Sequence, residues 1–203
     1  MGCILLLATT NRGKIREYKS LLSDLAFELV TLADLGITRK VDEVGESLEE
    51  NARLKATSLS EESHLLTLAD DSGLEVDALG GKPGPLSARY AGEGASDSER
   101  INYLLSQLKD VPWEKRSARF RCVIAIAKPS GEVELCSGES RGIIAFEPRG
   151  KRGFGYDPIF YLPELNKTMA ELPLEVKNRV SHRGQAARKA HQVLERLIGL
   201  PKA

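Results

Sequence analysis

The chain of 203 residues carries 29 Lys plus Arg and 29 Asp plus Glu, so its formal net charge is zero. A general nucleic-acid-binding protein depends on excess positive charge, and the balance argues against that class. With 41% hydrophobic and 29% charged residues the composition is that of an ordinary globular protein. The length suits one sizeable core, so we expect residues 1–203 to form a single domain.

The cysteines and the N-terminal segment indicate a cytoplasmic protein. Cys3, Cys122 and Cys136 include no CxxC spacing and are odd in number, which argues against a disulfide framework or a thiolate zinc site. The apolar run Cys3–Ala8 is too short for a signal peptide or a membrane span. We therefore expect no association with membranes.

The first third of the chain alternates between predicted strands and helices. Short apolar runs bounded by polar residues predict buried strands, and apolar residues at helical spacing predict helices. The sequence Ser47-Leu48-Glu49-Glu50 has the form of a capping box, which fixes the start of the second helix. The predicted strands are Cys3–Ala8, Phe27–Leu32 and Leu65–Ala69, and the predicted helices are Ile15–Leu25 and Leu48–Ser60.

The rest of the chain is richer in predicted strands. A helix is expected from Ser96 or Ser98 to Leu108, and Ser181 can cap a last helix. The predicted strands are Ser117–Ala127 and Glu132–Ser140, paired through a turn at Pro129–Gly131, and the short Arg141–Phe146 and Ile159–Tyr161. Alternating strands and helices followed by a meander predict an α/β fold with a mixed sheet and flanking helices.

The segment Ala8–Tyr18, "ATTNRGKIREY", is the first candidate site. A strand, a short polar loop and a helix start follow one another, and helix-start N–H groups with a nearby lysine suit a phosphate. The segment is not a Walker A loop, because Ala8 and Ile15 stand where Gly and Ser or Thr are required. A plain turn with Asn11 as cap and Lys14 in solvent is the alternative.

Asp70 and Asp71 form the second candidate, because they follow a predicted buried strand directly. Neighbouring strand residues point to opposite faces, so the two carboxylates should not be equivalent. One is expected to hydrogen-bond the glycine-rich turn that follows, and the other to be functional. Mg²⁺ needs only one or two carboxylates besides phosphate oxygens and water, and Asp71 with Glu43 would suffice. The alternatives are a solvated turn for Asp70 and Asp71 and a surface charge for Glu43.

Three further features are weaker alone. Lys55 shares a helix face with Asn51 in the helix after the capping box. In "GFGYDP" the glycines on both sides leave Phe154 free to present its ring to a base. In "SHRGQA" His182 and Arg183 offer donors at a helix start, although each is more often a core or surface residue.

Together these segments carry a resemblance to a known family. The stretches "ATTNRGK", "ENARLKA", "LADDSGLEVDALGGKPGPLSARYAG", "RGKRGFGYDPIFYLPELNKTMAEL" and "KNRVSHRGQA" cover most of the functional positions and are specific in combination. The chain resembles the inosine triphosphate pyrophosphatase family, hydrolases of non-standard purine nucleoside triphosphates. The resemblance implies an elongated mixed sheet, two lobes, a central nucleotide cleft and a homodimer.

The resemblance also implies roles for individual residues. Asp71 would be the general base and a magnesium contact, with Glu43, or alternatively Asp42, as the second acidic ligand. Triphosphate would be held by Thr9, Thr10, Asn11, Arg12, Gly13, Lys14, Lys55 and Ser72. Phe154 would stack on the purine beside Gly155, Tyr156 and Asp157, and Lys177, His182 and Arg183 would reach the base and phosphates.

The expected reaction is Mg²⁺-dependent hydrolysis of ITP, dITP or XTP to the monophosphate and pyrophosphate. Donors that pair with the 6-oxygen of inosine or xanthosine would mispair with the 6-amino group of adenosine. The alternatives are a related pyrophosphatase of pyrimidine or modified nucleotides and a nucleotide-binding sensor without turnover. The presence of Asp71, Lys14 and Lys55 indicates an active site rather than an inactive one.

Overall fold

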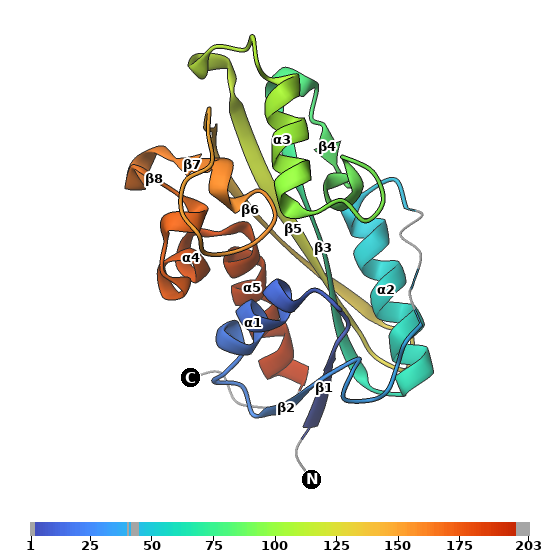
Figure 1. The fold of residues 1–203 in the computed structure, drawn as a ribbon. Helices are drawn as coiled ribbons and strands as arrows, with labels where there is room; N and C mark the ends of the chain where they lie inside the picture. The colour runs from blue at the N-terminus through green and yellow to red at the C-terminus, as the bar shows by residue number, and fades with distance from the viewer. Residues whose placement is uncertain (1–2, 40, 42–44, 198–203) are drawn as a thin grey trace. The chain divides into compact units, whose positions relative to one another are not determined.

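The computed structural model describes residues 3–39, 41 and 45–197, and these form one eight-stranded sheet and five α-helices (Figure 1). The strands are β1 (Cys3–Leu7), β2 (Phe27–Thr31), β3 (Leu66–Val76), β4 (Pro83–Gly84), β5 (Ser117–Ala127), β6 (Val133–Ile144), β7 (Phe160–Leu162) and β8 (Lys167–Thr168). The helices are α1 (Arg12–Leu21), α2 (Leu48–Ser63), α3 (Asp97–Gln107), α4 (Leu174–Val180) and α5 (His182–Leu197).

The sheet is mixed, which confirms the predicted α/β class. Its strand order is β2-β1-β3-β5-β6-β7-β8, and β4 pairs with β3. Strand β1 runs parallel to β2 and β3, whereas β7 runs antiparallel to β6 and β8. Within the described residues no helix has the length and apolar character needed to cross a membrane.

The chain divides into two compact units, and neither is a continuous piece of chain. The first comprises Met1–Asp71, Cys122–Gly138 and Arg183–Ala203, and the second comprises Ser72–Arg121 and Glu139–His182. Strands β3, β5 and β6 therefore each contribute residues to both units.

In the first unit the strands bury both faces, because successive side chains point to opposite sides. Leu5, Leu7 and Leu68 pack against α1 and α5, while Leu6 and Ala69 pack against α2. Figure 1 shows α1 and α5 on one side of these strands and α2 on the other. The same alternation decides which helices each functional residue of β3 will meet.

The second unit has its own apolar core. Leu74 and Val76 of β3 pack there with Ile101 and Leu104 of α3 and with Phe160 of β7. Helix α3 begins with a complete capping box, in which Ser96 and Glu99 bond each other's backbone N–H groups. These bonds stabilise the first turn of α3.

The boundaries of two predicted strand regions were wrong, and one helix was missed. The strand predicted to end at Ala69 runs to Val76, because Leu74 and Glu75 pair with β4 and the alternating Leu74 and Val76 are buried. The predicted strands either side of Ser140 are one strand, β6. Helix α4 was not predicted, since its seven residues are too few to show a clear period.

Candidate active site

The phosphate-loop candidate is a capped helix start, and Asn11 is its cap. The Asn11 side-chain oxygen accepts hydrogen bonds from the backbone N–H groups of Gly13 at 2.8 Å and Lys14 at 3.1 Å. The hydroxyl of Thr9 accepts from the Asn11 N–H at 3.2 Å, while Thr10 and Arg12 are exposed. The plain-turn alternative is therefore right about Asn11 but wrong about Lys14, whose ammonium is directed inward.

Asp70 lies on the α1 and α5 face of β3, in a buried ionic cluster of the first unit. Its carboxylate is 2.9 Å from Lys14 Nζ and 3.2 Å from Arg183 Nε, and Arg183 also binds Glu17 at 2.8 Å. Asp70, Glu17 and Arg183 are each only 1% exposed. The prediction that one aspartate caps the glycine-rich turn was therefore wrong, because Asp70 is paired with two cations instead.

The charges of this cluster set the protonation of Asp70. Burial alone raises the pKa of the carboxyl, but Lys14, Arg183 and Lys55 outweigh it and hold the pKa well below its usual range. The neighbouring thiol behaves in the opposite way, because burial and the Asp70 charge raise the pKa of Cys122 to about 12. Asp70 is therefore an anion at neutral pH and Cys122 a neutral thiol.

Asp71 lies on the other face of β3 and meets helix α2. Lys55 Nζ is 2.9 Å from one carboxylate oxygen, and the Asn51 amide donates to the other at 3.3 Å. The prediction that the two aspartates are not equivalent is confirmed, since Asp70 contacts α1 and α5 and Asp71 contacts α2.

The two lysines approach one backbone group from opposite sides of the sheet. The carbonyl oxygen of Asp70 accepts from Lys55 Nζ at 2.7 Å and from Lys14 Nζ at 3.4 Å. The two ammonium groups thus converge on one acceptor beside the Asp71 carboxylate, in a largely buried setting. Two ammonium groups placed in this way suit an anion with several oxygens, such as a phosphate chain.

The loop around Phe154 belongs to the second unit and is tightly hydrogen-bonded. Asp157 accepts from the Phe154 N–H at 2.8 Å and is ion-paired with Lys177, whose Nζ lies 4.9 Å from the centre of the Phe154 ring. Gly153 has a φ of +76°, and a Cβ there would lie 2.0 Å from the Asp157 carboxylate, so only glycine fits. Tyr156 is buried and donates to the carbonyl of Ser87 at 2.9 Å.

The remaining predicted residues are placed as follows. His182 is 4% exposed, and its ring stacks on Phe120 with centroids 4.6 Å apart. Ser72 is partly exposed and follows Asp71 directly. Glu43 and Asp42 lie outside the described residues. The first unit thus brings together Lys14, Lys55, Asp70, Asp71 and Arg183, and the second brings together Phe154, Asp157 and Lys177.

Sequence reasoning did not assign roles to Glu17 or Asn51. Glu17 is the buried counter-ion of Arg183. The sequence feature that could have indicated this role is a charged residue next to Tyr18 on the apolar side of α1. Asn51 was noted only for sharing a helix face with Lys55. Its Oδ1 accepts from the Gly45 N–H at 2.8 Å while its amide reaches Asp71.

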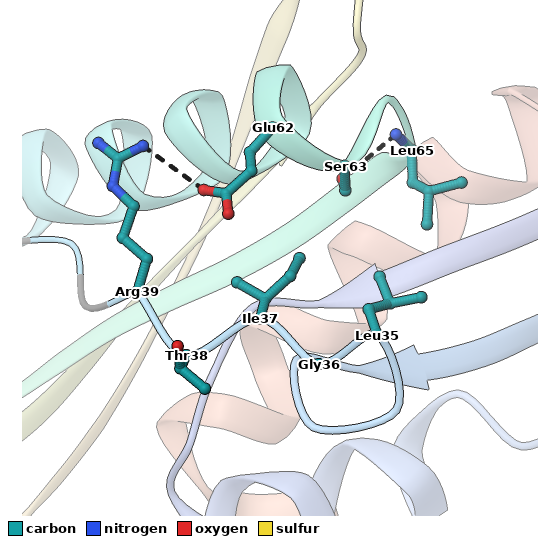
Figure 2. A pocket seen from close by; sticks show the side chains of 8 residues that line it. All are labelled: Leu35, Gly36, Ile37, Thr38, Arg39, Glu62, Ser63 and Leu65. Atoms are coloured by element: carbon teal, nitrogen blue, oxygen red, sulfur yellow. Dashed lines mark hydrogen bonds and ion pairs between the residues drawn. The ribbon is translucent and has the colours of Figure 1, made fainter.

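A surface hollow of about 530 Å³ lies elsewhere in the first unit, between the segment after β2 and the end of α2 (Figure 2). It is lined by Leu35 and Ile37 and by Arg39 and Glu62. Arg39 and Glu62 form an ion pair at 3.4 Å. It shares no residue with the predicted site, so we assign it no role.

Comparison with known proteins identifies the family of this chain. The Ham1 family matches residues 5–193. This chain belongs to the Ham1 family. It is 45% identical over 190 residues to the dITP/XTP pyrophosphatase of Bacillus subtilis, covering 94% of this chain and 96% of that protein. It is 53% identical over 182 residues to the dITP/XTP pyrophosphatase of Geobacter sulfurreducens, covering 90% and 92%.

Solved Ham1 structures share the fold. The Ham1 protein of Coxiella burnetii superimposes with a TM-score of 0.86 at 42% identity, covering 96% of this chain and 99% of that one. The Staphylococcus aureus Ham1 protein gives a TM-score of 0.84 at 41% identity, with the same coverage. The family predicted from the sequence is thereby confirmed.

Proposed function

We propose that this chain hydrolyses non-standard purine nucleoside triphosphates, namely dITP, ITP and XTP, to the monophosphate and pyrophosphate. The observation that carries the proposal is the convergence of Lys14 and Lys55 on one carbonyl beside the Asp71 carboxylate. Ham1 relatives of similar length are dITP/XTP pyrophosphatases, which gives the substrate class.

The donor set suits a divalent cation that arrives with the phosphates. Asp71 supplies a carboxylate, which is the kind of oxygen ligand that Mg²⁺ prefers in proteins. Within the described residues no group of three or more His, Cys, Asp or Glu side chains is arranged to hold a metal. Mg²⁺ needs only one or two carboxylates and takes its other ligands from phosphate and water. We propose Asp71 as one ligand and Glu43, or Asp42, as the second.

In this mechanism each residue has a definite task. Bound Mg²⁺ would neutralise phosphate charge and help to orient the attacking water. Asp71 takes the proton of that water, Lys14 and Lys55 stabilise the charge that develops on the phosphate oxygens, and the residues of the Thr9–Lys14 loop hold the chain of phosphates.

The second unit is proposed to bind the base. Phe154 stacks on the purine, with Gly155, Tyr156 and Asp157 around it, and stacking alone treats all purines alike. Lys177 and His182 of this unit and Arg183 of the first are the proposed donors to the base and phosphates. A donor aimed at the 6-oxygen favours inosine and xanthosine over adenosine, because the adenosine amino group leaves the donor unpaired.

The test is the initial rate of hydrolysis of dITP, ITP, XTP, GTP and ATP with Mg²⁺, with the products identified. We expect fast release of pyrophosphate from dITP, ITP or XTP and slow reaction of ATP. Comparable rates on ATP, or orthophosphate as the first product, would contradict the proposal. A preference for pyrimidine or modified nucleotides would favour the related pyrophosphatase, and tight binding without any product would favour the sensor.

We also propose that the protein is a homodimer, as the resemblance implies. Light scattering coupled to size-exclusion chromatography tests this, and a mass near 22.2 kDa across the concentration range would contradict it.

A further inference from the structure

The backbone of Phe154 is held on both sides by carboxylates. Its own N–H donates to Asp157 at 2.8 Å, and the next N–H, that of Gly155, donates to Asp97 at 2.6 Å. Asp157 is local to the loop, whereas Asp97 lies 58 positions earlier, in the first turn of α3. The peptide units before and after Phe154 are therefore both fixed by charge-assisted hydrogen bonds.

Asp97 is itself fixed in direction. Its second carboxylate oxygen is ion-paired with Arg100, and Arg100 also donates to the backbone carbonyl of Ala88 at 2.7 Å. The Asp97 side chain is 45% exposed, so burial alone would not hold its rotamer. The pairing with Arg100, which is itself anchored on Ala88, supplies that constraint instead.

An acidic residue in the first turn of a helix has an ordinary explanation, because it stabilises the helix dipole. Glu99 in the same turn serves that purpose and completes the capping box. The dipole does not require Asp97 to bind the Gly155 N–H or to be locked by Arg100. These two contacts connect α3 specifically to the loop that presents Phe154.

We propose that Asp97 is a positioning residue that directs the Phe154 ring toward the purine. This inference rests on the proposed function. Holding the Gly155 N–H fixes the ψ angle of Phe154, and the direction of the side chain follows from its backbone. A ring that is already oriented loses less conformational freedom when a base stacks on it, so the base binds more tightly.

The test compares Asp97→Ala with a matched control, Glu99→Ala, which removes the other first-turn acid without touching the loop. With dITP as substrate we expect Asp97→Ala to raise KM by about 3- to 10-fold and to change kcat by less than about twofold, the effect of losing one hydrogen bond of ordinary net strength. Asp97→Asn keeps an acceptor oxygen for Gly155 but loses the ion pair with Arg100, so its KM should lie between those of Asp97→Ala and the wild type. The Glu99→Ala control should lower Tm with an unchanged KM.

Two further measurements separate positioning from general stability. Inorganic tripolyphosphate has no base, so its inhibition constant should be the same for Asp97→Ala and the wild type. In a Phe154→Ala background, Asp97→Ala should raise KM no further, because residues that act through one contact are not additive. Additive effects, weaker tripolyphosphate binding, or an equal KM shift in Glu99→Ala would each overturn the proposal.

The same experiment distinguishes this proposal from the proposed function. Hydrolysis of dITP by the wild type is measured first, and its absence would count against the function itself. Normal wild-type turnover with an unchanged KM in Asp97→Ala would overturn the positioning role alone.

Discussion

The two asparagine variants of the adjacent aspartates should differ. Asp70→Asn should mainly lose stability, whereas Asp71→Asn should mainly lose turnover. Asp70→Asn removes the charge that Lys14 and Arg183 share in a buried cluster. Removing one partner of a buried ion pair costs about 3–5 kcal/mol. We expect the lower end, about 3 kcal/mol, because Arg183 keeps Glu17 and Lys14 is partly exposed.

Asp71→Asn should affect turnover far more than stability. The amide oxygen of asparagine still accepts from Lys55, and Lys55 keeps the Asp70 carbonyl at 2.7 Å, so we expect a loss of about 1 kcal/mol. The loss of a general base lowers the rate by about 10²–10⁴-fold, and weaker metal binding adds to this. Nucleotide binding through Lys14, Lys55 and Phe154 should partly survive.

The assay measures kcat, dITP affinity and Tm for both variants. For a chain of this length, a loss of about 3 kcal/mol corresponds to a decrease in Tm of roughly 6–12 °C. Asp70→Asn should show that decrease and retain turnover at temperatures where it is folded, although its affinity for dITP should fall because Lys14 loses its anchor. An active Asp71→Asn enzyme beside an inactive but stable Asp70→Asn enzyme would refute the reasoning.

Three other outcomes follow from the same contacts. Because the pKa of Asp70 is lowered by folding, its stabilisation is present above the unfolded carboxyl value of about 3.9 and is lost as the pH falls below it. Urea unfolding should therefore show the gap between wild type and Asp70→Asn shrinking at acidic pH, and a constant gap would contradict this. A thiol reagent at pH 8 should label the exposed Cys3 rapidly and the buried Cys122 and Cys136 only on unfolding, and rapid labelling of Cys122 in the folded protein would contradict the burial argument. Phe154→Ala should weaken the binding of all purine nucleotides alike, by about 1–3 kcal/mol, and a change in Tm with normal kinetics would place Phe154 in the core instead.

The sequence predicted those elements that depend on local patterns. The capping box at Ser47 and the apolar run of β1 are recognisable because each is decided by neighbouring residues. The end of β3 is not, since its continuation past Asp71 depends on pairing with β4. The segment Asp70–Val76, which precedes the glycine-rich turn, extends the strand because tertiary pairing outweighed local preference.

The residue types of the site were predictable, but their partners were not. The alternation of a strand was enough to predict that Asp70 and Asp71 differ. It did not show that Asp70 would meet Lys14 and Arg183, because those residues come from α1 and α5, far away in sequence. Asp97 escaped notice for the same reason, since its contact with Gly155 spans 58 positions.

The discontinuity of the first unit has a consequence for how the chain is made. Arg183 is synthesised well after Asp70 and Glu17, and until it emerges these two carboxylates lack a shared cation that the folded core provides. A nascent or prematurely terminated chain that stops before α5 would have to bury two carboxylates with incomplete neutralisation, which is strongly unfavourable. The ion pairs of Arg183 with Asp70 and Glu17 therefore form only once α5 is present, and a chain that stops before α5 should behave as an unfolded polypeptide rather than as a weakened enzyme.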